Sequence, residues 1–125
     1  MSNSVKNPDL EIQITWVYCS NLETSHRFYG ESLGLPLLRD EDSARIYKTT
    51  AGAAIGVCRA FEDRIVEPRG GMISLVTDDV DGWYKRLSET GVTTRGAPHV
   101  LEKFRIYTFF AEDPDGYVIE FQQFL

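Results

Sequence analysis

The sequence predicts an α+β fold made of two similar units, each with the element order strand, helix, strand, strand, strand. Three observations indicate this order. An apolar strand that runs into polar residues and a helix occurs at residues 18–23 and again at residues 76–81. A turn that leads into an apolar strand occurs at residues 50–57 and again at residues 114–121. Glycine follows both helices, as is common at helix C-termini. The chain is therefore predicted to repeat one supersecondary unit.

The first helix is expected to begin after a polar side chain that accepts hydrogen bonds from free backbone amides. Ser20, with Glu23 three residues later, fits a capping box. Gly34 supplies the left-handed residue that ends the helix. Strands are expected at residues 37–40 and 44–49. The less regular apolar face of this helix consists of Leu22, His26, Tyr29 and Leu33.

The second helix is expected to begin in the same way, with Asp78 and Asp81 placing negative charge at its N-terminus. Strands are expected at residues 93–96 and 104–111. The sequence Asp-Pro-Asp-Gly at residues 113–116 is typical of a tight turn before the last strand. The helix stripe that should bury Trp83 against the sheet consists of Val80, Trp83, Tyr84 and Leu87.

The length of 125 residues predicts one domain. We expect this domain to span residues 10–125, with a first module at about residues 10–60 and a second at about residues 71–124. The polar residues 60–70 are predicted to be a linker, and residues 1–9 a disordered N-terminal arm.

The charge of the chain limits its partners. Thirteen Lys and Arg against nineteen Asp and Glu give a net charge of −6, which repels nucleic acid and anionic membrane surfaces. No stretch without charged residues is long enough to form a membrane-spanning helix, and residues 1–10 lack the apolar core of a signal peptide. Cys19 and Cys58 lie in apolar runs, which favours buried thiols over a disulfide or redox pair. We therefore expect a cytoplasmic protein.

Several motifs carry a family resemblance. They are Ser-Asn-Leu-Glu at residues 20–23, Leu-Gly-Leu-Pro at residues 33–36, and the Asp-Pro-Asp-Gly turn with Glu120 four residues after its glycine. From about residue 11 to residue 124, the sequence resembles the glyoxalase/bleomycin-resistance/extradiol-dioxygenase family, also called vicinal oxygen chelate proteins. The resemblance implies two βαβββ modules whose mixed sheets curl around a cleft, which is usually completed by dimerisation or domain swapping.

The resemblance also implies where a divalent metal would bind in the enzymes of this family. One ligand lies on the first strand of each module, and one lies near the end of each last strand. Of these positions only Glu120 offers a suitable donor, because isoleucine and glycine offer none and a thioether is a soft ligand. His26 and His99 lack a spacing that would share a metal. We expect no metal cofactor, with an unconventional divalent metal site at Glu120 as the alternative. The four positions are Ile14, Met72, Gly56 and Glu120.

The alternation of side chains along a strand predicts which residues face the cleft. If Ile14 points inward, Trp16 and Tyr18 do so too and form an aromatic wall. A five-residue loop in the last hairpin would set Phe110 opposite Glu120. The predicted ligand-binding residues are Ile14, Trp16, Tyr18, Met72, Ser74, Phe110, Glu120 and Gln122.

These residues also have ordinary structural interpretations. Glu120 could reach water at the cleft mouth or pair with a lysine or arginine, because an unpaired buried carboxylate is costly. The aromatic side chains could pack against the other module or a dimer partner.

Three functional hypotheses follow from the resemblance and the missing metal ligands. The first is a binding protein that holds a small aromatic or amphiphilic molecule without metal, as the drug-sequestering members of the family do. The second is a lyase, isomerase or dioxygenase resembling lactoylglutathione lyase, with Glu120 as base or metal ligand. The third is a protein whose cleft is only a dimerisation surface. A homodimer is expected because the modules leave exposed sheet edges.

Overall fold

The structure is a computed structural model that describes residues 6–125. Of the arm predicted to be disordered, residues 1–5 lie outside the described residues. Residues 6–9 are exposed and belong to no helix or strand.

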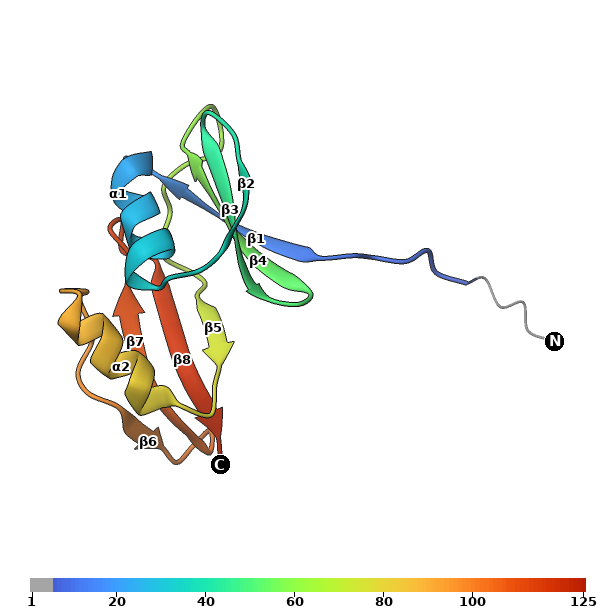
Figure 1. Cartoon of the computed structure of the whole chain (residues 1–125). Helices are drawn as coiled ribbons and strands as arrows, with labels where there is room; N and C mark the ends of the chain where they lie inside the picture. The colour runs from blue at the N-terminus through green and yellow to red at the C-terminus, as the bar shows by residue number, and fades with distance from the viewer. Residues whose placement is uncertain (1–5) are drawn as a thin grey trace.

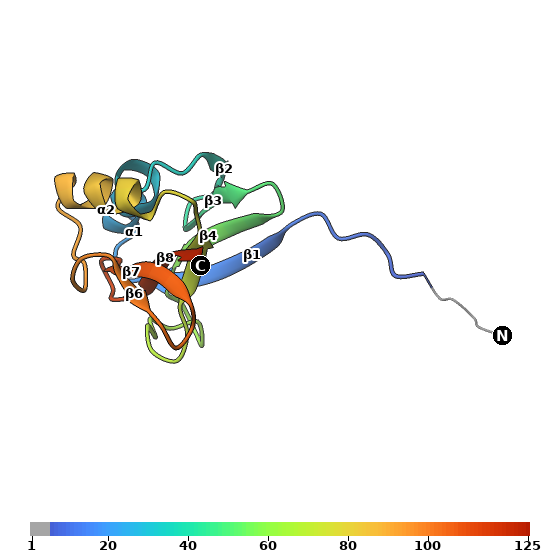
Figure 2. The same ribbon diagram turned by 90° about the horizontal axis from the view of Figure 1, so that it is seen from below.

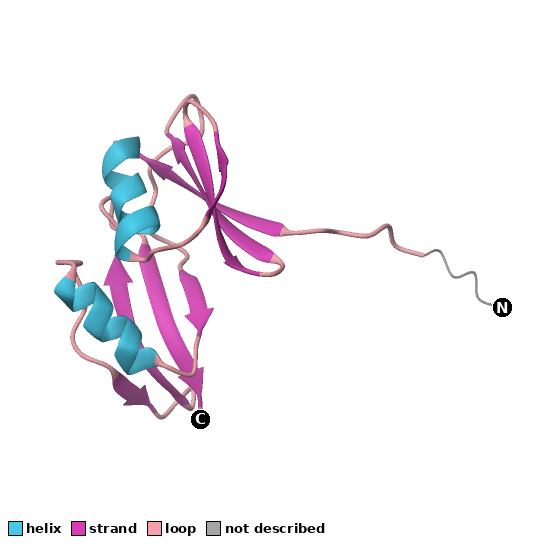
Figure 3. Cartoon of the chain, in the orientation of Figure 1, coloured by secondary structure: helices cyan, strands magenta, loops and turns pink. Residues whose placement is uncertain are grey.

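The first module forms a four-stranded mixed sheet, here called sheet one, with helical turns packed on one face (Figures 1 and 3). The strand order is β1-β4-β3-β2, with β1 parallel to β4 and the other pairs antiparallel. A short α-helix, α1 (Leu22–His26), continues into a π-helix, η1 (Arg27–Ser32). The strands are β1 (Gln13–Cys19), β2 (Leu37–Asp40), β3 (Ala44–Thr50) and β4 (Ala53–Arg59).

The second module repeats this topology in sheet two, with the order β5-β8-β7-β6 and β5 parallel to β8. The two helical segments lie next to each other in both views (Figures 1 and 2), and Arg86 Nε of α2 donates to the Ser32 carbonyl at 2.9 Å. The chain is therefore an α+β protein with two open sheets. The elements are β5 (Ile73–Val76), α2 (Val80–Glu89), β6 (His99–Leu101), β7 (Ile106–Glu112) and β8 (Val118–Phe124).

Both helices begin one residue later than the sequence predicted. The side chain of Asn21 accepts from Thr24 N at 3.0 Å, and that of Asp79 accepts from Gly82 N at 3.0 Å. The predicted cap Ser20 instead donates its hydroxyl to Asp115 Oδ1 at 2.6 Å. The capping prediction at Ser20 and Asp78 was therefore wrong, although both helices shift equally and the repeat is kept.

The second module differs from the prediction between α2 and β7. The strand expected at residues 93–96 is reduced to one bridge between Thr94 and Ala111. The edge strand is β6 instead, so His99 lies in a strand and not in a loop. The strand β7 begins at Ile106, after a turn in which Arg105 adopts a positive φ of 55°. This turn shortens the strand that the sequence predicted at residues 104–111.

One hydrophobic core spans both modules between the helices and the two sheets. Its centre in the second module is an aromatic stack in which Phe121 lies 5.1 Å from Phe109 and 5.0 Å from Trp83, measured between ring centroids. Phe121 and Phe109 are fully buried, whereas Trp83 is only half-buried at the margin of the stack. Trp83 therefore packs against the sheet as predicted, but it is less completely buried than predicted.

The Asp-Pro-Asp-Gly turn is fixed to the first module by a buried carboxylate. Asp113 Oδ2 accepts from the Tyr29 hydroxyl at 2.7 Å, and Oδ1 accepts from the amides of Asp115 and Tyr117, each at 2.9 Å. Gly116 has a φ of 93°, as the turn requires. Burial raises the pKa of the Asp113 carboxyl, and burial together with Asp113 raises that of the Tyr29 phenol.

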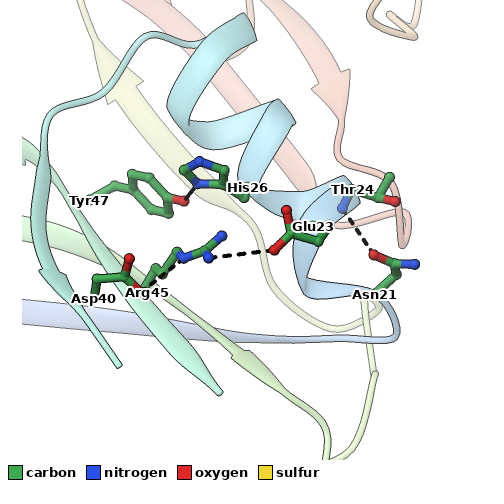
Figure 4. A network of polar contacts seen from close by, with 7 residues as sticks. All are labelled: Asn21, Glu23, Thr24, His26, Asp40, Arg45 and Tyr47. Atoms are coloured by element: carbon green, nitrogen blue, oxygen red, sulfur yellow. Dashed lines mark hydrogen bonds and ion pairs between the residues drawn. The ribbon is translucent and has the colours of Figure 1, made fainter. Parts of the chain in front are cut away.

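Polar contacts hold α1 against sheet one (Figure 4). Arg45 forms ion pairs with Asp40 at 3.1 Å and with Glu23 at 3.5 Å. His26 is half-buried and hydrogen-bonds through Nδ1 to the Tyr47 hydroxyl. These contacts are structural, because they lie on the helix side of the sheet.

The two cysteines are free and buried, as the sequence predicted. Burial raises the pKa of the Cys19 thiol, which keeps it protonated and poorly reactive. Among the described residues, the helices are too short or too polar to cross a membrane.

Candidate ligand-binding site

The strands place the predicted site residues on the faces of the sheets that the helices do not cover. Along β1, Val17 and Cys19 are buried in the core, so the alternate residues Trp16 and Tyr18 point to the other face. Along β8, Ile119 and Phe121 enter the core, which sends Glu120 to the opposite face. The predicted alternation is confirmed on both strands.

The register of sheet two brings several predicted residues together around Glu120. Phe110 pairs with Glu120 in the last hairpin, as predicted, and Ser74 pairs with Glu120 on its other side. Next to this row, Thr108 pairs with Gln122. These residues therefore share one face, with the carboxylate at its centre.

This face holds a hollow of about 380 Å³, which we call the sheet-two hollow. Its walls are apolar and aromatic, while its polar groups come from the neighbouring strands β5 and β8. Five of the eight predicted residues line it, namely Met72, Ser74, Phe110, Glu120 and Gln122.

Glu120 is buried, with 2% of its surface exposed, and its carboxylate accepts three hydrogen bonds. Oε1 accepts from Ser74 Oγ at 2.5 Å and from Gln122 Nε2 at 2.9 Å, and Oε2 accepts from Thr108 Oγ1 at 2.8 Å. Within residues 6–125, Glu120 has no ion pair with a lysine, arginine or histidine. The interpretation of Glu120 as exposed to water or paired with a cation was therefore wrong, because neutral donors satisfy it instead.

Trp16 and Tyr18 belong to a different hollow in the same chain. The two aromatic rings line an open space of about 590 Å³ together with Arg64 and Tyr117, and we call it the linker hollow because residues 63–67 form its other wall. Arg64 Nη1 donates to the Tyr18 hydroxyl at 3.1 Å. The Tyr117 hydroxyl fastens the linker by accepting from the Glu67 amide at 3.0 Å and donating to the Tyr18 carbonyl at 2.9 Å.

Gly56 explains how Trp16 lies on sheet one. The two residues pair across β1 and β4, and a Cβ atom at position 56 would come within 2.5 Å of the Trp16 indole. The absence of a side chain at residue 56 therefore gives the indole room against the sheet.

Met72 lies between the two hollows. It lines the sheet-two hollow and also a smaller cavity of about 290 Å³ that it shares with Trp16. Ile14 lines none of these three spaces. Five of the predicted residues thus lie together in the sheet-two hollow. Trp16 and Tyr18 line the linker hollow instead, and Ile14 lines neither.

Four residues of the sheet-two hollow were missed in the sequence. Two of them continue an alternation that the sequence already showed, since residue 106 precedes Thr108 by two and residue 124 follows Gln122 by two. The third, at residue 104, lies in the turn before β7, which the sequence did not predict. The fourth comes from β6, which had no clear sequence signal. The missed residues are Leu101, Phe104, Ile106 and Phe124.

The residues at the family's metal positions do not fit a divalent metal. Ile14 and Gly56 offer no side-chain donor atom, and both oxygens of Glu120 already accept hydrogen bonds from neighbouring side chains. Within the described part of the chain, no three His, Cys, Asp or Glu side chains lie close enough together to hold a metal ion. A single carboxylate is too few ligands for the metals usual in such sites.

Known structures share this architecture. TnmS3, an antibiotic-binding protein from Streptomyces sp. CB03234, is 28% identical and superposes with a TM-score of 0.76 over 96% of this chain and 100% of its own. A lactoylglutathione lyase from Agrobacterium tumefaciens is 19% identical, with a TM-score of 0.74 over 93% of this chain and 95% of its own. A glyoxalase/bleomycin resistance protein/dioxygenase from Alicyclobacillus acidocaldarius is 18% identical, with a TM-score of 0.76 and 92% coverage of both chains. The last two show the common fold only.

A comparison of the sequence with protein-family models identifies the family of the chain. No protein of curated function matches it significantly. The model of the Glyoxalase/Bleomycin resistance protein/Dioxygenase superfamily matches residues 11–121, which is nearly the whole chain. The chain therefore belongs to the glyoxalase/bleomycin resistance protein/dioxygenase superfamily.

Proposed function

We propose that this protein binds a small aromatic or amphiphilic molecule in the sheet-two hollow without a metal ion. The observation that carries this proposal is the state of Glu120, whose carboxylate is buried among apolar walls and held by three neutral donors. Such a combination of apolar lining with a few fixed polar groups is typical of small-molecule sites.

The charge of Glu120 favours a particular kind of ligand. No cationic side chain of the described residues pairs with it, so its negative charge is compensated only by hydrogen-bond dipoles. Charges interact more strongly in a site shielded from water. A ligand with a positive or hydrogen-donating group would therefore gain from lying over Gln122 and Ser74, while its apolar part contacts Phe110 and Met72.

The comparisons support binding more directly than catalysis. The antibiotic-binding protein is the most similar in sequence of the three structures compared, and its whole length is covered. The enzyme hypothesis, a metal-dependent lyase, isomerase or dioxygenase using Glu120, needs metal donors that positions 14, 56 and 72 do not supply. We therefore place it second.

A pair of matched dyes tests the proposal. We expect 9-aminoacridine, which is cationic at pH 7.5, to bind with a Kd at least about tenfold lower than that of neutral acridine, because only the first has a charge that Glu120 attracts. Glu120→Gln should remove this preference and leave the affinity for acridine within about twofold. Dye fluorescence and calorimetric titration measure both values.

Glu67→Gln serves as the control, because this exposed carboxylate lines the linker hollow and not the sheet-two hollow. It should leave both affinities unchanged. Equal binding of the two dyes by the unmodified protein, or a preference that survives Glu120→Gln, would refute the role given to Glu120. Failure of both dyes to bind at millimolar concentration would refute the hollow as an aromatic site.

We also propose a homodimer and a cytoplasmic location. The homodimer is supported by the exposed apolar residues Met72 and Val76 on the uncovered side of sheet two and by the free edges at β1 and β5. The location is supported by the two free cysteines, which suit a reducing compartment.

A further inference from the structure

The hydroxyl of Thr108, on β7, has two hydrogen-bond acceptors within reach. Its Oγ1 lies 2.8 Å from Oε2 of Glu120 and 3.0 Å from the carbonyl oxygen of Phe121. A hydroxyl carries a single proton, so it donates one full hydrogen bond at a time. Thr108 is completely buried, and its one proton is therefore divided between a carboxylate and a backbone carbonyl.

The two oxygens of the Glu120 carboxylate are consequently not equally satisfied. Oε1 accepts from two side chains, Ser74 Oγ at 2.5 Å and Gln122 Nε2 at 2.9 Å. Among the described residues, Oε2 accepts only from Thr108, and it shares this donor with the Phe121 carbonyl. A carboxylate has about four lone-pair sites, and a buried one gains from each donor it receives. Oε2 is therefore the oxygen that has room for another donor.

The lining of the sheet-two hollow offers Oε2 no other donor on the side of β7. Ile106 and Phe110 precede and follow Thr108 by two residues, and both line the hollow with apolar side chains. Thr108 pairs with Gln122 across β7 and β8, so a ligand group above Gln122 lies next to Thr108 and to Oε2 of Glu120. A second donor for this oxygen has to come from the ligand.

We propose that Thr108 determines which ligands the site around Glu120 prefers, because its hydroxyl is an exchangeable donor. In the empty hollow the hydroxyl donates to Oε2. When a ligand brings an N–H group to Oε2, the hydroxyl turns and donates to the Phe121 carbonyl instead. The ligand thus adds one hydrogen bond without leaving an acceptor of this group unpaired.

The exchange favours one class of ligand, a primary or secondary ammonium group attached to an aromatic or other apolar body. A cation without an N–H group leaves the Thr108 hydroxyl on Oε2 and gains only the attraction between the charges. This inference rests on the proposed function, because it requires a ligand in the sheet-two hollow.

The exchange also predicts that Thr108→Val has the opposite effect to the loss of an ordinary ligand contact. Valine keeps the branched shape of threonine but has no hydroxyl, so Oε2 has no donor while the hollow is empty. A ligand N–H group then supplies a donor that the variant lacks, whereas in the wild type it replaces one that is already present. The preference for N–H ligands should therefore increase in the variant.

Two matched probes test this expectation. 1-Naphthylmethylammonium and (1-naphthylmethyl)trimethylammonium have the same ring and the same charge at neutral pH, but only the first has N–H groups. The ratio of their Kd values, trimethylammonium over primary ammonium, should rise by at least about fivefold in Thr108→Val when measured by calorimetric titration. Thr108→Ser keeps the hydroxyl and should leave the ratio within about twofold of the wild type. The desolvation of each probe cancels from the change in the ratio, because it is the same in all three proteins.

The outcomes separate this inference from the proposed function. A ratio that is unchanged or lower in Thr108→Val, or that rises equally in Thr108→Ser, would overturn the role of Thr108 while both probes still bind. If neither probe binds the unmodified protein, the proposed ligand site fails, and the inference fails with it.

A crystal structure of the unmodified protein with the primary ammonium probe bound gives a second test, which does not require Thr108→Val to fold. The ammonium nitrogen should lie within about 3.2 Å of Glu120 Oε2, with Thr108 Oγ1 still at hydrogen-bond distance from the Phe121 carbonyl. An ammonium group that contacts only Oε1, or that lies away from Glu120, would refute the exchange.

Discussion

Replacing Asp113 by alanine should lower the free energy of unfolding by about 3 to 5 kcal/mol, because three donors lose their acceptor at once. These donors are the Tyr29 hydroxyl, which is fully buried, and the amides of Asp115 and Tyr117. The loss also detaches the β7–β8 turn from η1, so both modules are affected. Urea denaturation followed by circular dichroism measures the change.

Asp113→Asn separates the loss of hydrogen bonds from the loss of charge. The amide oxygen can still accept from both backbone amides, and the amide nitrogen can donate to the Tyr29 hydroxyl. We expect this variant to keep most of the stability that Asp113→Ala loses. Equal destabilisation by the two variants would show that the charge, and not the hydrogen-bond geometry, is what the fold requires.

The same pair predicts a pH dependence. Burial raises the pKa of the Asp113 carboxyl in the folded chain, so the folded state holds this proton more tightly than the unfolded state does. The contribution of this group to the free energy of unfolding therefore falls as pH rises from about 4 through the raised pKa, and is constant above it. Asp113→Asn should lack this fall. A fall of the same size in the variant would assign it to other groups.

Phe121→Ala should cost about 3 to 5 kcal/mol of stability, because it removes the middle ring of a buried aromatic stack and leaves a cavity. Phe121 is fully buried between Phe109 and Trp83, with the Phe109 ring tilted by only 9° from it. Thermal and urea denaturation should both show the loss. A variant that unfolds within about 1 kcal/mol of the wild type would mean that the core does not depend on this stack.

Trp83→Ala is the comparison for that experiment. Trp83 contacts the same ring but is half-buried, so its removal should cost about 1 to 3 kcal/mol, less than Phe121→Ala. A larger loss of stability in Trp83→Ala than in Phe121→Ala would contradict the expectation that the more deeply buried ring contributes more.

Much of the fold could be predicted because the repeat appears in local chemistry. Gly34 and Gly91 end the two helices with φ values of 68° and 75°, as their positions after the apolar stripes indicated. The five-residue turn at 113–117 fixed the register of the last hairpin, since turn length determines which residues pair. These features depend on neighbours in the sequence.

The features that were predicted wrongly depend on contacts between residues far apart in the sequence. Ser20 was a reasonable helix cap, yet its hydroxyl donates a hydrogen bond to Asp115, which lies far along the chain. The edge strand β6 is only three residues long and pairs with β7 on one side, so its sequence carries little strand signal. Trp83 lies on the predicted helix face, but the amount of sheet beneath it could not be known from periodicity.

In the candidate site, too, local features could be predicted and contacts between distant residues could not. The period of two along β1 and β8 was enough to place Trp16 and Glu120 on the uncovered faces. It could not show that these faces form separate hollows with Met72 between them, because that depends on how the two sheets lie in space. Nor could it identify Ser74 and Thr108 as the donors to Glu120, since both come from other strands.

The central claim is that Glu120 belongs to a ligand site and not to a metal centre, and metal analysis tests it most directly. The protein should be purified without chelators and without immobilised-metal chromatography, and then measured by inductively coupled plasma mass spectrometry. We predict less than about 0.1 mole of zinc, nickel, manganese or iron per mole of chain, because one hydrogen-bonded carboxylate is too few ligands. One equivalent of a metal in the wild type that disappears in Glu120→Gln would contradict the account and favour a metal-dependent enzyme.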